Sequence, residues 1–326
     1  MVRRAIQPTR KVPGVVMRSE LMSTSAAANL SLLSAAERRA VWVSRLCRQA
    51  LIAEAELTPK PGLVDRRGAG CHTDLSLTMM RRSARAIEPY FYRMALISSE
   101  AVAGQPLREQ LADIGRNAER AMFKTTGGSN SHKGAIWILG LLSSAVSTLG
   151  DGATVAEIAE AARSIASFPD RAALQLVTHG QVVAERYGAQ GARGEALRGF
   201  PHVVHVGLPT LRTKRSGGAT ESVARIDTLL SIMSHLEDTC VLYRGKAAAL
   251  EAVRDGALKV IASGGCGSEL GEQQLRQVDS ELRVLRVSPG GSADLLAATL
   301  LLDAVERRQH DVQEDQSWLE DTDGTN

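Results

Sequence analysis

The chain has 326 residues, a net charge of +3 at pH 7 and only 3% aromatic residues. This length can bury the core of one large domain, and the modest charge, without basic runs that contain aromatics, argues against a nucleic-acid partner. The four cysteines are scattered and form no CxxC pair, which favours a reducing, cytoplasmic location over a disulfide framework or a zinc site.

The two ends of the chain differ in composition from its middle. Residues 1–30 carry five basic residues against one acid and have no apolar stretch of signal-peptide length. Residues 310–326 are rich in Asp and Glu. Because neither end shows apolar periodicity, we expect two disordered tails around a folded domain at 31–309. The longest apolar run, 135–146, is shorter than the ~20 residues that cross a membrane, so we expect no membrane partner.

Apolar residues in the middle of the chain recur every three or four positions, which is the spacing of amphipathic helices. The expected helices cover 36–57, 76–98, 107–123, 133–149, 153–166, 170–187, 222–243, 246–262, 269–286 and 292–308. The sequence shows neither alternating strand patterns nor the GxGxxG fingerprint of a Rossmann fold. It therefore predicts an all-α protein with a single multi-helix domain, whose glycine-rich loops carry the chemistry.

The first such loop, 54–76, follows the first expected helix. Two prolines flank Lys60 and restrict the backbone around it. Asp65, His72 and Asp74 follow, and carboxylates presented by a loop suit Mg²⁺, which prefers oxygen ligands. The plainer alternative is a stiff turn with an N-cap aspartate ahead of the next helix.

A second loop precedes the helix expected at 133–149. It contains Gly127, Gly128, Ser129, Asn130, His132 and Lys133. The loop is not of the Walker A type, because a histidine rather than a glycine precedes the lysine. Glycines let a ligand approach the backbone and the free N–H groups of a helix start attract phosphate, so we expect a phosphate cradle. The alternative is an ordinary cap by the serine or the asparagine, with the histidine and lysine solvated.

Two later stretches carry weaker signals. At 191–201, Arg193 and Glu195 lie among glycines, and the planar donors of arginine match phosphate oxygens, although one arginine on a loop is more often plain surface. At 235–245, the periodicity places Asp238 on a helix, where a charge is usually part of the solvated face.

The last stretch, 288–303, is a glycine turn that leads into a helix. Gly290 and Gly291 precede the helix, and Asp294 falls in its first turn. The aspartate either compensates the helix dipole or binds a metal, and the spacing does not separate these two roles.

Taken together and in this order, LTPKPGLVDRRGAGCHTDL, TTGGSNSHKGAIW, YGAQGARGEALRGFP, DTCVLYRG and SPGGSADLLAATLLLD resemble triphosphoribosyl-dephospho-CoA synthase. The similarity spans about residues 45 to 305 and is strongest to the branch that serves malonate decarboxylase rather than citrate lyase. It implies an α-helical enzyme that joins ATP to 3′-dephospho-CoA, releases adenine and makes 2′-(5″-triphosphoribosyl)-3′-dephospho-CoA. This product is the prosthetic-group precursor for an acyl carrier protein, which a downstream transferase system would load.

The resemblance also implies roles for individual residues. Contacts to substrate are implied for Lys60, His72, Gly127, Gly128, Asn130, His132, Lys133, Arg193, Gly290 and Gly291. Catalytic roles are implied for Asp65, Asp74, Glu54 and Glu195. The implied ligands of an expected Mg²⁺ are Asp65, Asp74 and Asp294. The resemblance does not assign the general base to one of these carboxylates.

Two other functions fit the same residues. One is a different nucleotide N-glycosyl transferase or hydrolase, which would keep the phosphate contacts and use another acceptor. The other is a binding protein without catalytic activity, in which the loops are only caps and turns. Release of adenine that depends on dephospho-CoA would separate the expected enzyme from both.

Overall fold

The computed structural model describes residues 33–172 and 179–322 of the chain. These described residues contain no β-strand, only an isolated bridge between Asp65 and Gly68. The prediction of a single all-α domain is confirmed. The tail expected at 1–30 lies outside the described residues.

The described helices vary widely in length. Their bounds are α2 (Ala35–Glu56), α3 (Leu77–Ser98), α4 (Gln105–Thr126), α5 (Lys133–Leu149), α6 (Val155–Ser167), α7 (His179–Tyr187), α8 (Gly191–Leu197), the π-helix η1 (His202–Gly207), α9 (Leu208–Ser216), α10 (Glu221–His235), α11 (Thr239–Ala262), α12 (Glu269–Leu285) and α13 (Gly290–Thr322). The expected helices that agree with these bounds to within two residues are 36–57, 76–98, 133–149, 153–166 and 269–286.

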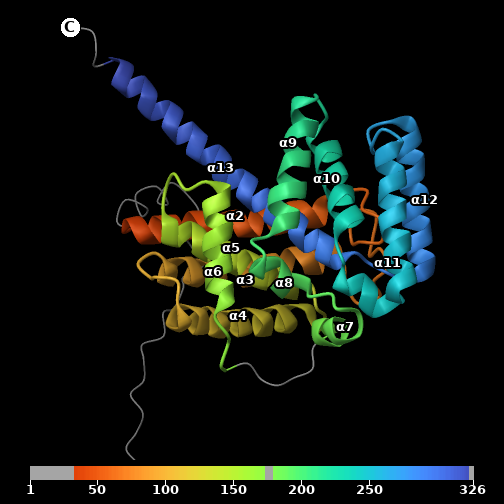
Figure 1. The fold of residues 1–326 in the computed structure, drawn as a ribbon, viewed down its shortest axis with the longest axis horizontal. Coiled ribbons are helices and arrows are strands. Elements are labelled where there is room, and N and C mark those ends of the chain that lie inside the picture. The colour runs from red at the N-terminus through yellow and green to blue at the C-terminus, as the bar shows by residue number, and fades with distance from the viewer. Residues whose placement is uncertain (1–32, 173–178, 323–326) are drawn as a thin grey trace, which may run out of the picture.

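Helix α3 packs between α2 and α4, and local signals fix the ends of all three helices (Figure 1). α2 begins with a capping box, in which Ser34 and Glu37 each accept a hydrogen bond from the other's backbone N–H. The N-cap of α3 is Ser76, whose hydroxyl accepts a hydrogen bond from the Met79 N–H. An aspartate was expected in this role. α4 ends at Gly127, whose φ of 67° is left-handed and favours glycine.

The core centres on α5 and the first half of α13, which pack against each other and against α2. Most residues from 135 to 147 in α5 and from 293 to 302 in α13 are buried. A helix that is apolar on nearly every side belongs in a protein interior. The starts of both helices are therefore surrounded by protein, and their free N–H groups must find acceptors there.

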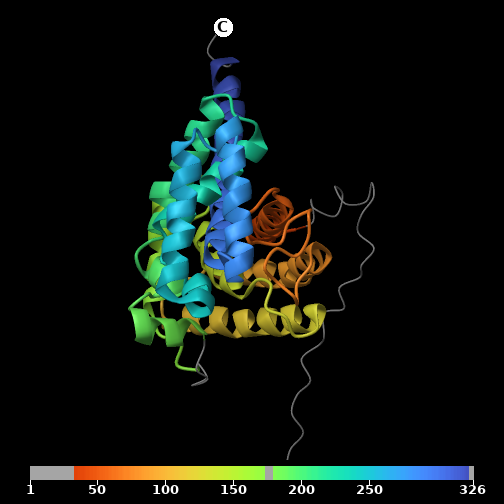
Figure 2. The same cartoon turned by 90° about the vertical axis from the view of Figure 1, so that its right-hand side faces the viewer.

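Helices α9 to α12 stand beside this core, and α11 packs against both α10 and α12 (Figures 1 and 2). The prediction of one helix over 222–243 is wrong, because α10 ends at His235. Leu236 is extended, with ψ of 138°, and Asp238 caps a new helix by accepting a hydrogen bond from the Cys240 N–H. Within α11, Lys246 has a non-helical φ of 62°.

The segment 191–216 differs most from expectation, because the loop predicted at 191–201 is wrong. α8 occupies its first residues, and η1 and α9 follow. Prolines in this segment are typical of turns, but Pro201 is the N-cap of η1 and Pro209 lies in the first turn of α9, where a missing N–H is tolerated.

Two expected helix ends also differ. The start predicted at 170 is wrong, because Asp170 accepts a hydrogen bond from the Ala172 N–H in a turn; the helix is described only as α7. α13 continues to Thr322, past the end expected at 308 and into the acidic tail, where it projects from the other helices (Figure 1). None of the described helices is long and apolar enough to cross a membrane.

Candidate active site

The loop between α2 and α3 is organised around Asp65. Its carboxylate accepts hydrogen bonds from the backbone N–H groups of Lys60 (2.9 Å) and Arg67 (2.7 Å). The Arg67 guanidinium also donates to Asp65 (2.9 Å) and pairs with Asp279 of α12 (3.1 Å). Asp65 therefore holds the loop in shape, and its catalytic and metal-binding roles stay predictions.

The same loop buries Lys60 against the end of α2. The ammonium group donates to the backbone carbonyl of Glu54 (2.7 Å) and forms an ion pair with its carboxylate. Lys60 is 1% exposed and Glu54 is 4% exposed. A lysine in this position needs an anionic partner, because burying an isolated charge costs several kcal/mol. The residue expected to contact phosphate thus has a carboxylate partner inside the protein.

His132, the N-cap of α5, is also buried, so the alternative in which it is solvated is wrong. Its Nδ1 lies 2.9 Å from the Ser83 hydroxyl and 3.2 Å from the Ser131 hydroxyl. Burial and the nearby charge of Lys60 lower the pKa of His132 to about 3, so the imidazole is neutral at neutral pH. Its Nε2 has no hydrogen-bond partner among the described residues. Buried polar atoms are normally paired, so this nitrogen has an unused capacity for one hydrogen bond.

The start of α5 is occupied by protein oxygens. Asn130 accepts a hydrogen bond from the Lys133 N–H (3.0 Å), so the asparagine cap named as an alternative is present. Asp294 of α13 accepts from the Ala135 N–H and lies so close that a Cβ on Gly134 would be 2.1 Å from its Oδ2. Asp294 thus compensates the dipole of α5 rather than that of its own helix. A phosphate at this helix start stays a prediction and would have to displace these groups.

The start of α13 is occupied in the same way by Asp238. This carboxylate accepts from the N–H groups of Gly291 (3.3 Å) and Ser292 (2.8 Å) and from the Ser292 hydroxyl (3.0 Å). A Cβ on Gly291 would lie 3.0 Å from Asp238, and one on Gly290 would lie 3.2 Å from Cys240 Sγ. Asp238 is 1% exposed, so its placement on a solvated helix face is wrong.

The negative charges of Glu54 and Asp238 act on Asp294, and we call these three residues the carboxylate cluster. Burial, followed by the negative charges of Glu54 and Asp238, raises the pKa of Asp294 well above its usual range. Burial also raises the pKa of Asp238. The cluster therefore holds more negative charge than Lys60 compensates, and a cationic group or a proton would relieve it.

The donor set of this region bears on the expected Mg²⁺. In the parts of the chain that the structure describes, no three His, Cys, Asp or Glu side chains are grouped so that they could hold a metal ion. Mg²⁺ is usually held by one or two carboxylates together with substrate phosphates and waters. Asp74 fits such a shared site because its side chain is 57% exposed. The raised pKa of Asp294 disfavours the ionised form that a ligand needs, and the oxygens of Asp65 are bound by Lys60 and Arg67.

Three of the quoted motifs meet at a rim beside the cluster. His72 Nε2 lies 2.9 Å from the Ser288 hydroxyl, and its Nδ1 lies 3.7 Å from Asp74. Burial, followed by the positive charge of Arg244, lowers the pKa of His72. The Asp74 side chain is 57% exposed, so it can contact a ligand that approaches from solvent.

Lys133 and Glu195 have partners outside the cluster. Lys133 pairs with Glu119 at 3.2 Å on the α4 side of the helix. Glu195 is 2% exposed and accepts hydrogen bonds from the backbone N–H of His202 and from its Nδ1, both at 2.8 Å. Glu195 thereby fixes the start of η1, and its catalytic role stays a prediction.

Arg193 lies in α8, beside α5. Trp137 Nε1 donates to the Ala192 carbonyl (3.2 Å), and the Arg108 guanidinium stacks over the Trp137 ring at 4.7 Å. Arg193 is close enough that its charge acts on Arg108. Arg193 itself is exposed and lies near Arg108 and Trp137, and no contact from it to the carboxylate cluster is present in the described chain.

Gly127 and Gly128 have φ values of 67° and 99°. A Cβ on either residue would meet no protein atom within 4 Å. Glycine is thus required for the backbone conformation, and the space that an approaching ligand would need is open.

Three residues that build the site were missed from the sequence: Ser83, Arg67 and Asp279. Ser83 is fully buried on α3, and a serine at an apolar position of a helix was the available signal. In the sequence, Arg67 and Asp279 look like ordinary surface charges. They are 212 positions apart, so the sequence around either residue does not indicate that they pair.

Residues 40–312 match the family described as ATP:dephospho-CoA triphosphoribosyl transferase. A 2-(5''-triphosphoribosyl)-3'-dephosphocoenzyme-A synthase from Klebsiella pneumoniae is 47% identical over 277 residues, which cover 85% of this chain and 99% of the relative. A probable synthase of the same name from Stutzerimonas stutzeri (strain A1501) is 50% identical over 272 residues, 83% of this chain and 92% of the relative. No solved structure matches the chain.

Proposed function

The chain belongs to the ATP:dephospho-CoA triphosphoribosyl transferase family, and we propose that it makes 2′-(5″-triphosphoribosyl)-3′-dephospho-CoA from ATP and 3′-dephospho-CoA. The observation that supports this reaction most directly is the convergence of four of the five quoted motifs on one site. That site combines the carboxylate cluster, Lys60 and the unpaired Nε2 of His132.

The proposed reaction exchanges one bond at the ribose of ATP. The 2′-hydroxyl of dephospho-CoA attacks C1′, the bond from C1′ to adenine breaks, and the triphosphate stays attached. The hydroxyl proton must reach a base and adenine must receive a proton as it leaves. Asp294, whose pKa is raised, suits the donor of that proton, and the Glu54 carboxylate suits stabilisation of positive charge at C1′.

Mg²⁺ is part of the proposal, as an ion that arrives with the triphosphate. Asp74, whose side chain is exposed at the rim, would hold it. Asp294 would stay protonated as the acid for adenine and would therefore not ligate the ion. When bound, the ion would neutralise phosphate charge so that a polyanion can approach the carboxylate cluster. Lys60 and His132 would orient the substrate beside it.

The test is incubation with ATP, Mg²⁺ and 3′-dephospho-CoA, followed by chromatography for adenine and the mass of the adduct. We expect adenine and adduct in equal amounts, and a rate about 10²–10⁴-fold lower in Asp294→Asn. Adenine without adduct, independent of dephospho-CoA, would support the alternative of a nucleotide hydrolase. No adenine under any condition would refute the proposal.

We further propose that the product serves malonate decarboxylase, through the transferase that loads its acyl carrier protein. The resemblance of the five motifs to that branch supports this assignment. Deletion of the gene should abolish growth on malonate and leave growth on citrate intact. Loss of growth on citrate alone would assign the enzyme to citrate lyase instead.

A further inference from the structure

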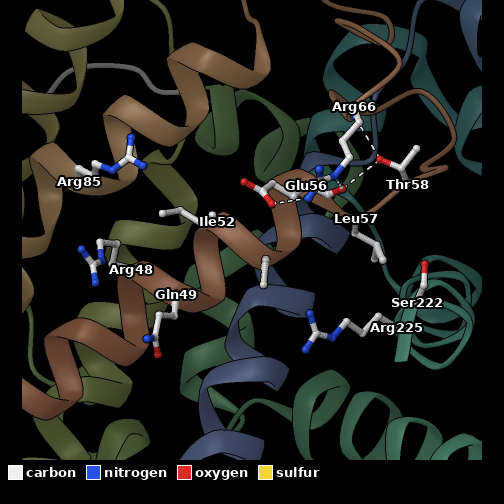
Figure 3. A pocket seen from close by; sticks show the side chains of 11 residues that line it. Arg48, Gln49, Ile52, Glu56, Leu57, Thr58, Arg66, Arg85, Ser222 and Arg225 are labelled. Atoms are coloured by element: carbon white, nitrogen blue, oxygen red, sulfur yellow. Dashed lines mark hydrogen bonds and ion pairs between the residues drawn. The ribbon is translucent and has the colours of Figure 1, made fainter. Parts of the chain in front are cut away.

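An open pocket of about 700 Å³ lies on the face of α2 that points away from the carboxylate cluster. We call it the arginine pocket, because it is lined by Arg48 of α2, Arg66 of the following loop, Arg85 of α3 and Arg225 of α10. Figure 3 shows Arg48 and Arg85 to one side of α2 and Arg225 to the other, with the side chain of Ile52 between them. Four separate segments thus bring like charges to one concavity.

The acids around this pocket compensate its arginines only in part, because each acid is shared by one arginine of the pocket and one arginine outside it. Glu56 pairs with Arg66 and with Arg81, both at 2.6 Å. Glu221 pairs with Arg225 (2.6 Å) and with Arg215 (2.7 Å).

The third acid follows the same pattern. Glu88 lies 3.5 Å from Arg48 and is also within reach of the charge of Arg45. Arg48 Nε is buried and has no hydrogen-bond partner within the described chain. Arg85 is exposed and forms no ion pair with any described residue. The pocket therefore keeps an excess of positive charge and unused N–H donors.

The shape and the lining of the pocket indicate a small ligand. Its volume falls in the range of ~300–1,000 Å³ that is typical of small-molecule sites. Ile52, Ala53 and Leu57 supply apolar surface, and guanidinium groups are suited to phosphate oxygens because they offer paired, planar donors. A ligand with a chain of phosphates and an apolar part would satisfy both features.

We infer that the arginine pocket binds the phosphate chain of a nucleotide, outside the carboxylate cluster; this rests on the proposed function. A phosphate chain that carries no bound cation is repelled by the cluster and attracted by the pocket. The two regions are linked directly, since the loop that carries Lys60 into the cluster also contributes Arg66 to the pocket. The phosphate chain belongs either to ATP or to dephospho-CoA, and both carry the recognised chemistry.

Isothermal titration of Arg85→Gln with inorganic triphosphate, ATP and 3′-dephospho-CoA tests this inference. Arg85 has no partner to lose, so the fold should be unchanged. We expect the affinity for inorganic triphosphate to fall about tenfold, as for one lost charge-assisted hydrogen bond. The matched control is Arg82→Gln, because Arg82 is an exposed arginine of the same helix that does not line the pocket. In this variant we expect the affinity for inorganic triphosphate to change by less than about twofold.

The three ligands separate the possible sources. If the affinity of Arg85→Gln also falls for ATP but not for dephospho-CoA, the pocket binds the triphosphate of ATP. If it falls for dephospho-CoA but not for ATP, the pocket binds the diphosphate of dephospho-CoA. Both outcomes support the inference. Equal triphosphate affinity in Arg85→Gln and Arg82→Gln would overturn it. Adduct formation by the unmodified protein is measured in parallel, so failure of the proposed function is seen independently of failure of the pocket.

Discussion

The last turn of α2 separates two regions of opposite character. Glu54 faces inward, is 4% exposed and joins the carboxylate cluster, whereas Glu56 faces the arginine pocket two residues later. In the cluster, acids are in excess, and Glu54 and Asp238 are held by Lys60 and by the start of α13. In the pocket, arginines are in excess and water reaches them. The comparison shows that burial decides how much a charge affects the stability of the fold. An unpaired charge is costly in the buried cluster, whereas in the open pocket it is solvated by water.

The largest effect should follow from Lys60→Met. This change leaves Glu54 buried without its partner, so we expect the free energy of unfolding to fall by about 3–5 kcal/mol. Urea unfolding followed by circular dichroism measures it. Adding Glu54→Gln should restore part of the loss, because it removes the stranded charge. If the free energy of unfolding of Lys60→Met changed by less than ~1 kcal/mol, the buried pair would contribute no more than an exposed one, and the two regions would not differ in this respect.

The pH dependence of unfolding tests the buried side through His132. Its pKa of about 3 lies below the ~6.5 of an unfolded histidine. Between these values the unfolded chain binds a proton that the folded chain does not, so stability falls as the pH drops below 6.5, by up to ~1.4 kcal/mol per pH unit.

His132→Asn should remove this part of the slope between pH 6 and pH 4. The matched control is His235→Asn, which alters an exposed histidine of α10 and should leave the slope unchanged. Equal slopes for the His132 variant and the unmodified protein would contradict the buried, neutral imidazole.

Gly134→Ala tests how closely the cluster is packed. The new Cβ would lie 2.1 Å from Asp294 Oδ2, so the carboxylate must move away from the start of α5. We expect unfolding to become easier by about 1–3 kcal/mol and adenine release to slow. At Gly115 of α4 the nearest contact is Met94 at 3.7 Å, so Gly115→Ala should be neutral or stabilising by up to ~1 kcal/mol.

The smallest effect is expected in the pocket. Arg66→Gln removes an ion pair with Glu56 in which the arginine side chain is 59% exposed, and the unfolding free energy should change by less than ~1 kcal/mol. Addition of salt should reduce even this difference, because exposed pairs are screened. If the free energy of unfolding fell by several kcal/mol regardless of salt, the ion pair of Arg66 and Glu56 would behave as a buried pair, which would contradict the comparison.

Several helix positions could be predicted from apolar spacing, as for α5, whose expected and observed bounds are the same. The break after His235 could not, because the residues around it keep helical apolar spacing. That break depends on Asp238 reaching Ser292, a partner 54 positions away. The helices at 191–216 were missed because glycine and proline are ambiguous between a turn and a helix start.

The loops of the candidate site could be located from the sequence, but the contacts between them could not be predicted. Its loops stand out by glycine and polar content, and His132 is at the helix start as expected. The partners are set by tertiary contacts: nothing local shows that Lys60 meets Glu54 or that Asp294 caps α5. The arginine pocket left no signal, because its residues come from four segments and each one alone is an ordinary surface arginine.

The helix caps supplied by distant residues also have a consequence for synthesis. α5 receives an acceptor from Asp294, and α13, which carries Asp294, receives its own from Asp238. A ribosome makes α5 long before it makes α13, so the first amides of α5 have no Asp294 to bind for most of translation. Contacts between segments this distant in sequence form slowly. The nascent chain therefore cannot complete the site until α13 has emerged from the ribosome.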